Sequence, residues 1–228
     1  MDSATKMILK EVIDSVPDNT KVYLFAGTVR NLIYNMYHDD KLPQADYDCL
    51  VIGDGEKFAK NLEKESFIYG SKNSDFAKIL KKAKVKSLED KFENYVFLDL
   101  KIYSGDGDTL QILNKIADFT ISAVALDIKD LFEEDWQDRV ISLPESFDDM
   151  ENKVLRPVNL SRIKVYKIIR MASQGFKLSN NFDFQKVKSQ IIQEKSEKEL
   201  EKTIRYVGSR EKVTQIAKEL NIDTNSFI

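Results

Sequence analysis

Residues 21–38 of this 228-residue chain read KVYLFAGTVRNLIYNMYH. Residues 22–25 favour a β-strand, and the pair of small residues at 26–27 follows them as a turn. Over residues 28–38 the apolar side chains recur at helical spacing. The stretch therefore predicts a strand, a tight turn and a helix in immediate succession.

The sequence on either side extends this pattern into a mixed sheet with helices. Helical spacing predicts helices at residues 3–15, 55–65 and 109–127. Strand-forming runs predict strands at residues 49–52, 76–80, 95–103 and 140–143. From about residue 160 onward only helical patterns remain. We therefore expect an α+β protein, with a small mixed β-sheet flanked by helices over residues 1–155 and an all-helical domain over residues 156–228.

Composition excludes several classes of protein. With 42% hydrophobic and 32% charged residues, the chain is typical of a globular protein rather than a disordered one. It has no apolar run of the roughly 20 residues that a membrane span needs and no signal peptide, so we expect a cytoplasmic protein with no membrane contact. A net charge of -3 means that any RNA binding depends on local basic patches. One Cys and one His cannot form a zinc cluster, so a metal would be held by carboxylates.

Three carboxylates are candidates for that role. On a strand, Asp46 and Asp48 would point to the same side and could converge on Mg²⁺. Asp99 lies in an apolar strand between two leucines, where an acidic residue calls for an explanation. The alternatives are a solvated loop-to-strand junction for the pair, and an ion pair with Lys101 for Asp99.

The turn at residues 26–31 (AGTVRN) is a candidate anion site. Gly27 permits a ligand to approach the backbone closely, and the N-terminus of the following helix favours an anion such as a triphosphate. Arg30 could add a positive charge. The alternative is a tight turn with a surface arginine.

Taken in chain order, these segments resemble the head and neck domains of the class II tRNA nucleotidyltransferase and poly(A) polymerase family. The family's Gly-Gly-x-Val-Arg-Asp turn and Asp-x-Asp strand are similar to residues 26–31 and 46–48 (DYD). Its Arg-Arg-Asp-Phe-Thr-Ile-Asn-Ala segment resembles residues 116–123 (IADFTISA), and the segment that follows it resembles residues 146–156 (SFDDMENKVLR). The neck helix that ends in Gly-Phe resembles residues 164–176, so the agreement is collinear over about residues 20–177.

The resemblance implies a nucleotidyltransferase palm followed by a helical neck. It also implies Mg²⁺-dependent addition of nucleotides to an RNA 3′-hydroxyl by a two-metal mechanism, of the tRNA CCA-end or poly(A) type. The implied catalytic residues and metal ligands are Asp46, Asp48 and Asp99. The implied nucleotide-binding residues are Gly27, Thr28, Arg30 and Asp118. The implied RNA-binding residues are Arg156, Arg162, Lys164, Lys167 and Arg170.

The chain departs from the family where the incoming nucleotide is recognised. The family's paired arginines are replaced by Ile116 and Ala117, and its base-reading Glu-Asp-x-x-Arg signature aligns with residues 160–164 (LSRIK). The family's selectivity between ATP and CTP is therefore not implied here. These departures leave a second hypothesis open, a degenerate member that binds RNA or a protein partner without catalysis. A third is nucleotidyl transfer to a small molecule or a protein.

The partners implied are a nucleoside triphosphate, ATP or CTP, and an RNA such as tRNA. The resemblance ends with the neck and does not extend to the family's body and tail, which grip the tRNA elbow. We therefore expect a homodimer or a partner subunit to supply the missing RNA contacts.

Overall fold

The structure is a computed structural model of the 228-residue chain. The structure describes residues 3–42, 46–65, 67–73, 76–82, 95–103, 107–182 and 197–222. Contacts divide the chain into two compact units, one formed by Met1–Gln111 with Val124–Ser142, the other by Ile112–Ala123 with Leu143–Ile228. The sequence predicts one boundary at residue 155, whereas the division by contacts assigns two separate segments to each unit. The boundary at residue 155 stays a prediction.

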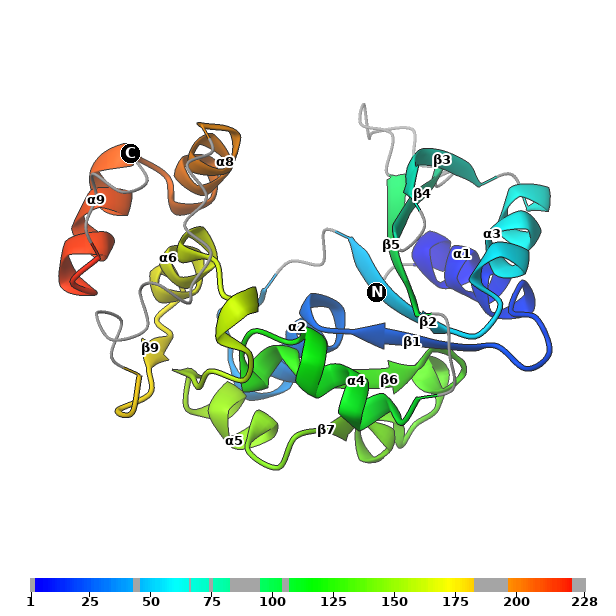
Figure 1. The fold of residues 1–228 in the computed structure, drawn as a ribbon, viewed down its shortest axis with the longest axis horizontal. Helices are drawn as coiled ribbons and strands as arrows, with labels where there is room; N and C mark the ends of the chain where they lie inside the picture. Colours follow the sequence, from blue (N-terminus) through cyan, green and yellow to red (C-terminus); the bar gives the residue numbers. More distant parts are fainter. Residues whose placement is uncertain are drawn as a thin grey trace. The chain divides into compact units, whose positions relative to one another are not determined.

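The first unit is built on a mixed sheet of seven strands in the order β3-β4-β5-β2-β1-β6-β7 (Figure 1). Strands β2 and β5 run parallel, and the other neighbouring strands run antiparallel. The strands are β1 (Lys21–Phe25), β2 (Tyr47–Ile52), β3 (Ile68–Asn73), β4 (Phe76–Lys82), β5 (Tyr95–Tyr103), β6 (Val124–Asp127) and β7 (Ile141–Ser142).

Helices flank this sheet, as the sequence predicts. They are α1 (Ser3–Asp14), α2 (Gly27–Tyr37) and α3 (Gly55–Lys64), with short 3-10 helices η2 (Ile128–Phe132) and η3 (Trp136–Arg139). Figure 1 shows α1 and α3 next to each other, and the side-chain amide of Asn61 on α3 donates a hydrogen bond to the carbonyl of Ser15 just after α1, at 3.0 Å. Helix α4 (Thr109–Ile116) begins in the first unit and ends in the second.

The core of the first unit follows the alternation of the central strands. On β5, Leu98 and Leu100 are fully buried, whereas Phe97, Asp99 and Lys101 are partly exposed. Successive side chains on a strand point to opposite faces, so Asp99 lies on the face opposite the two buried leucines. The alternation of residues 97–101 in the sequence corresponds to this arrangement.

The second unit is mostly helical. Its elements are η1 (Thr120–Ser122), α5 (Ser146–Glu151), β8 (Val154–Leu155), η4 (Leu160–Arg162), α6 (Val165–Ser173), β9 (Lys177–Leu178), α8 (Glu197–Val207) and α9 (Arg210–Glu219). Helix α6 buries Tyr166, Ile168 and Ile169, and it packs against α8 and α9. None of the helices in the described part of the chain is long and apolar enough to cross a membrane.

The structure has four short strands that the sequence did not predict: β3, β6, β8 and β9. The predicted helix over residues 109–127 ends at Ile116, and Val124–Asp127 forms β6, because pairing with β1 outweighs the local helical pattern. Strand β3 was not predicted, since its sequence IYGSKN carries little apolar periodicity. The two-residue strands β8 and β9, which pair with each other, are too short to give a sequence signal.

Candidate functional site

Two of the three predicted carboxylates lie opposite each other in the sheet. Asp48 on β2 and Asp99 on β5 are direct Cα partners in the parallel pair. Partner residues of neighbouring strands point to the same face of a sheet, so both carboxylates lie on one face. The fully buried Cys49, Leu98 and Leu100 lie on the other face. The fold thus brings together two acidic residues that are far apart in the sequence.

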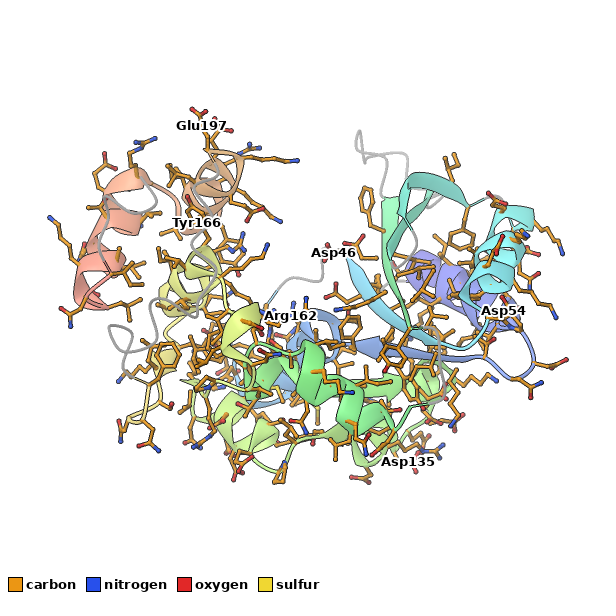
Figure 2. The ribbon with its side chains drawn as sticks, in the orientation of Figure 1. Asp46, Asp54, Asp135, Arg162, Tyr166 and Glu197 are labelled. Carbon is orange, nitrogen blue, oxygen red and sulfur yellow. The ribbon has the colours of Figure 1, made fainter. Side chains whose placement is uncertain are left out.

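Asp46 lies just before the first residue of β2 and takes no part in strand pairing (Figure 2). Within the residues that the structure describes, no group of three or more His, Cys, Asp or Glu side chains is arranged to hold a metal ion. The structure therefore places Asp48 with Asp99 and does not gather all three carboxylates into one cluster.

The turn between β1 and α2 lies against Asp48. A Cβ atom at Gly27 would lie 2.9 Å from Oδ2 of Asp48, so a side chain there would displace the Asp48 carboxylate. The preceding residue, Ala26, has a φ of 47° and a ψ of -116°, a backbone conformation that favours glycine. Asp48 of the same chain therefore approaches the Gly27 backbone closely, and the contact of Gly27 with a ligand stays a prediction.

Thr28 also faces β2. Its side chain is fully buried, and its Oγ1 atom accepts a hydrogen bond of 2.8 Å from the backbone N–H of Asp48. The resemblance implies that Thr28 binds phosphate. In this geometry its hydroxyl contacts the backbone of Asp48. The group of Thr28 that is suited to a phosphate contact is its backbone N–H, because it lies at the N-terminus of α2.

Arg30 lies in the first turn of α2 and is partly exposed. Its guanidinium donates to Oδ1 of Asn31, with Nε at 3.1 Å and Nη2 at 2.8 Å. This contact orients the guanidinium, whose Nη2 atom would lie 3.7 Å from a Cβ atom at Gly27. The positive charge therefore lies at the same helix N-terminus as Gly27.

These residues fit Mg²⁺ held together with a substrate. Mg²⁺ is bound in proteins through one or two carboxylates plus substrate phosphates, rather than by a cage made of protein alone. Asp48 and Asp99 supply two carboxylates on one sheet face. The Gly27 turn, which contacts Asp48, is suited to phosphate.

Cys49, which follows Asp48 on β2, is a buried structural residue. Burial and the nearby negative charges of Asp48 and Asp99 raise the pKa of its thiol far above the ordinary value. The thiol therefore stays protonated at neutral pH, and it is neither a nucleophile nor a metal ligand.

In the second unit, Asp118 is paired with Lys167. Nζ of Lys167 lies 2.5 Å from Oδ2 of Asp118 and donates to Oγ of Ser122 at 3.2 Å. The backbone N–H of Phe119 donates to Oδ1 of Asp118 at 2.8 Å. Burial opposes ionisation of Asp118, but Lys167 and these hydrogen bonds outweigh it and lower the pKa of the carboxyl. One predicted nucleotide-binding residue and one predicted RNA-binding residue thus form an ion pair.

A second network in this unit holds Arg156. Its guanidinium makes two hydrogen bonds to the carboxylate of Asp149, at 2.9 and 3.1 Å, and Thr120 donates its hydroxyl to the same carboxylate at 2.6 Å. The side chain of Asp149 is 2% exposed, whereas that of Arg156 is 43% exposed. Sequence reasoning missed Asp149 and Thr120, although both lie in segments that match the family, because only their contacts reveal the network.

The other predicted RNA-binding residues lie on or next to α6. Arg170 pairs with Glu199 on α8 at 3.4 Å, whereas Arg162 is exposed on η4 (Figure 2). Lys164 is the residue just before α6 and is partly exposed. Arg156, Lys167 and Arg170 thus each pair with an acidic residue of the second unit.

The fold is similar to solved structures of CCA-adding enzymes. A Thermotoga maritima CCA-adding enzyme complexed with tRNA is 16% identical with a TM-score of 0.63, over 97% of this chain and 52% of that chain. A tRNA-processing enzyme in an apo form is 18% identical with a TM-score of 0.65, over 97% and 58%. The Bacillus stearothermophilus CCA-adding enzyme in complex with CTP is 14% identical with a TM-score of 0.60, over 100% and 54%.

The chain thus spans about half the length of the structures that it matches. No protein-family model and no curated protein sequence matches it. At this level of identity the similarity is one of fold. The predicted resemblance is confirmed at that level: the chain has the head-and-neck fold of the CCA-adding enzymes, a nucleotidyltransferase palm with a small mixed sheet followed by a helical neck.

Proposed function

We propose that the protein is a template-independent RNA nucleotidyltransferase, which transfers a nucleotide from a nucleoside triphosphate to an RNA 3′-hydroxyl and releases pyrophosphate. The observation that carries this proposal is the placement of Asp48 opposite Asp99, with the Gly27 turn packed against Asp48. Two carboxylates on one sheet face, beside a helix N-terminus with an arginine, are suited to a metal-bound triphosphate. The similarity in fold to CCA-adding enzymes supports this assignment.

Asp48 and Asp99 would hold Mg²⁺, and Asp46 would join them when substrate binds. The bound Mg²⁺ would lower the pKa of the attacking 3′-hydroxyl and neutralise charge on the triphosphate. Arg30 and the first N–H groups of α2 would orient the phosphates, since both favour anions. The protein would therefore position two carboxylates, one arginine and the N-terminus of α2 around one triphosphate.

Recognition of the base would differ from that of the family. The positions of the family's paired arginines hold Ile116 and Ala117, and Asp118 is engaged by Lys167. No guanidinium at positions 116 and 117 can form the bidentate contacts that fix a nucleotide's orientation. We therefore infer weaker discrimination between ATP and CTP, both of which occur in complexes of the structures that share this fold.

The RNA would lie along the basic residues of the second unit. Arg162 is exposed on η4, and Lys164, just before α6, is partly exposed, so both could contact RNA phosphates. Arg156, with 43% of its side chain exposed, could contact a phosphate while it stays bound to Asp149. We favour a tRNA as this RNA, because one of the enzymes with a similar fold was solved in complex with tRNA.

The experiment that tests this function is an RNA extension assay with purified protein, Mg²⁺ and each labelled nucleoside triphosphate in turn. The acceptors are tRNA that ends before its CCA and a generic RNA. We expect extension by the wild type and a loss of at least about 100-fold in Asp48→Asn, because one carboxylate ligand is removed.

Asp54→Asn is the matched control. Asp54 lies just past the other end of β2 (Figure 2), where its side chain accepts a hydrogen bond from the N–H of Lys57 and caps α3. Asn caps a helix as well as Asp does, so this variant should extend RNA at the wild-type rate. Equal rates in Asp48→Asn and the wild type would contradict the assignment.

The departures at the nucleotide site support a second candidate, a protein of this fold that binds RNA or a protein partner without catalysis. Two observations favour it: Ile116 and Ala117 are apolar, and Asp118 forms an ion pair with Lys167. This candidate predicts no measurable binding of Mg²⁺-ATP. Calorimetric titration with Mg²⁺-ATP separates the two candidates, since micromolar affinity would exclude the second.

A further inference from the structure

The end of the pairing between β1 and β2 leaves one backbone group to be satisfied at the candidate site. The two strands pair from Lys21 with Ile52 to Leu24 with Cys49, and there the pairing ends. The chain then turns at Ala26 and enters α2. The N–H of Asp48, the next residue on β2, therefore needs an acceptor from outside the ladder, because a buried N–H without one is costly.

Thr28 supplies this acceptor. Its Oγ1 atom lies 2.8 Å from the backbone nitrogen of Asp48, and its side chain is fully buried. On the other side, Oδ2 of Asp48 is packed against the Cα of Gly27, where a Cβ atom would be only 2.9 Å away. The start of α2 thus holds Asp48 at two points, its backbone nitrogen and its carboxylate.

We propose that Thr28 is a positioning residue, whose hydroxyl fixes the backbone of Asp48 so that the carboxylate is held in place for the divalent metal of a bound nucleoside triphosphate. This inference rests on the proposed function. It gives the Thr28 side chain a role different from the phosphate contact that the family resemblance implies. The hydroxyl is buried and directed at β2, so it acts through Asp48.

The physical reason is that Mg²⁺ demands near-ideal octahedral geometry and tolerates misplaced ligands poorly. Partners that orient a metal ligand typically change metal affinity or activity by about 10- to 100-fold when they are removed. Thr28→Val keeps the branched shape and removes the hydroxyl, which leaves the N–H of Asp48 without its acceptor. Thr28→Ser keeps the hydroxyl and removes a methyl group.

The test compares wild type, Thr28→Val, Thr28→Ser and Thr28→Ala, all in the full chain. Mn²⁺ binding is titrated by electron paramagnetic resonance in the presence of a non-hydrolysable ATP analogue, and the Mg²⁺ dependence of RNA extension is measured alongside. We expect Thr28→Val and Thr28→Ala to weaken Mn²⁺ binding about 10-fold and to raise the Mg²⁺ concentration for half-maximal extension about as much. Thr28→Ser should stay within about 2-fold of the wild type, because the hydroxyl alone is needed.

Circular dichroism identifies any variant that fails to fold. If Thr28→Val does not fold, the comparison of Thr28→Ser with Thr28→Ala tests the inference. Wild-type affinity for Mn²⁺ in Thr28→Val or Thr28→Ala would overturn the inference, and so would equal weakening in Thr28→Ser and Thr28→Ala. The two proposals fail separately. A wild type that binds Mn²⁺ with the analogue but extends no RNA contradicts the transferase, whereas an active wild type with unchanged Thr28 variants contradicts only the role of Thr28.

Discussion

At the scale of single residues, the candidate site depends on close packing of small groups at the start of α2. Gly27 leaves the Asp48 carboxylate in place, because Oδ2 of Asp48 would lie 2.9 Å from a Cβ there and would have to move. The residue before it is less well suited, since Ala26 has a φ of 47° that L side chains other than Asn and Asp rarely adopt. The family resemblance places a glycine at this position, so the chain carries local strain beside its proposed metal site.

Replacement of Ala26 by Gly is expected to relieve that strain. Ala26→Gly should raise the free energy of unfolding by about 1 kcal/mol, because glycine adopts positive φ without steric cost. Urea denaturation followed by circular dichroism measures the change. Ala59→Gly, in the interior of α3, is the control and should lower the free energy of unfolding by about 1 kcal/mol or more. If both variants lower it equally, Ala26 is not strained.

The faces of the site residues could be predicted from the sequence, but their partners could not. Period-2 alternation correctly places Asp99 on the face opposite Leu98 and Leu100. Asp99 lies opposite Asp48 because β2 pairs with β5. Along the chain, a helix and two strands separate β2 from β5. Such pairing is set by the tertiary fold, and no local pattern encodes it.

At the scale of elements, ion pairs and hydrogen bonds join the segments of the second unit. Lys167 on α6 reaches Asp118 just before η1, and Arg156 just after β8 reaches Asp149 on α5. The hydroxyl of Ser146 adds a hydrogen bond of 2.9 Å to the carbonyl of Thr120. These contacts fix the segment whose sequence matches the family's nucleotide-binding motif.

The Asp118–Lys167 pair should make stability depend on pH. Because the pKa of Asp118 is lowered in the folded state, the pair stabilises the protein above about pH 4, the ordinary carboxyl range, and this contribution is lost as the pH falls through the lowered pKa. Lys167→Met should cost about 3 kcal/mol at pH 7, because a buried charge loses its partner. The cost should shrink in acid, where Asp118 is protonated in both proteins.

Urea titrations of wild type and Lys167→Met between pH 2 and pH 7 measure this difference. Lys167→Arg, which keeps the charge, is the control and should lose less stability than Lys167→Met at pH 7. A difference between wild type and Lys167→Met that is the same at every pH would contradict an ionised Asp118 in the folded protein.

At the scale of the whole molecule, the order of motifs along the chain predicts the fold better than any single motif does. Each short motif is weak by itself, yet the collinear set correctly indicates a nucleotidyltransferase palm with a helical neck, as the similar solved structures confirm. Strand β6 was missed because its four residues form a strand only through pairing with β1. The fold alone does not fix the chemistry, which depends on whether Asp48 and Asp99 act on the same metal.

That question is tested most directly by the RNA extension rates of wild type, Asp48→Asn, Asp99→Asn and the double variant, at saturating Mg²⁺ and triphosphate. If both carboxylates serve one metal site, each single variant loses most of the activity, and the double variant is no slower than the slower single variant. Losses that multiply in the double variant would show that the two residues act independently. Undiminished extension in either single variant would contradict the account of this site.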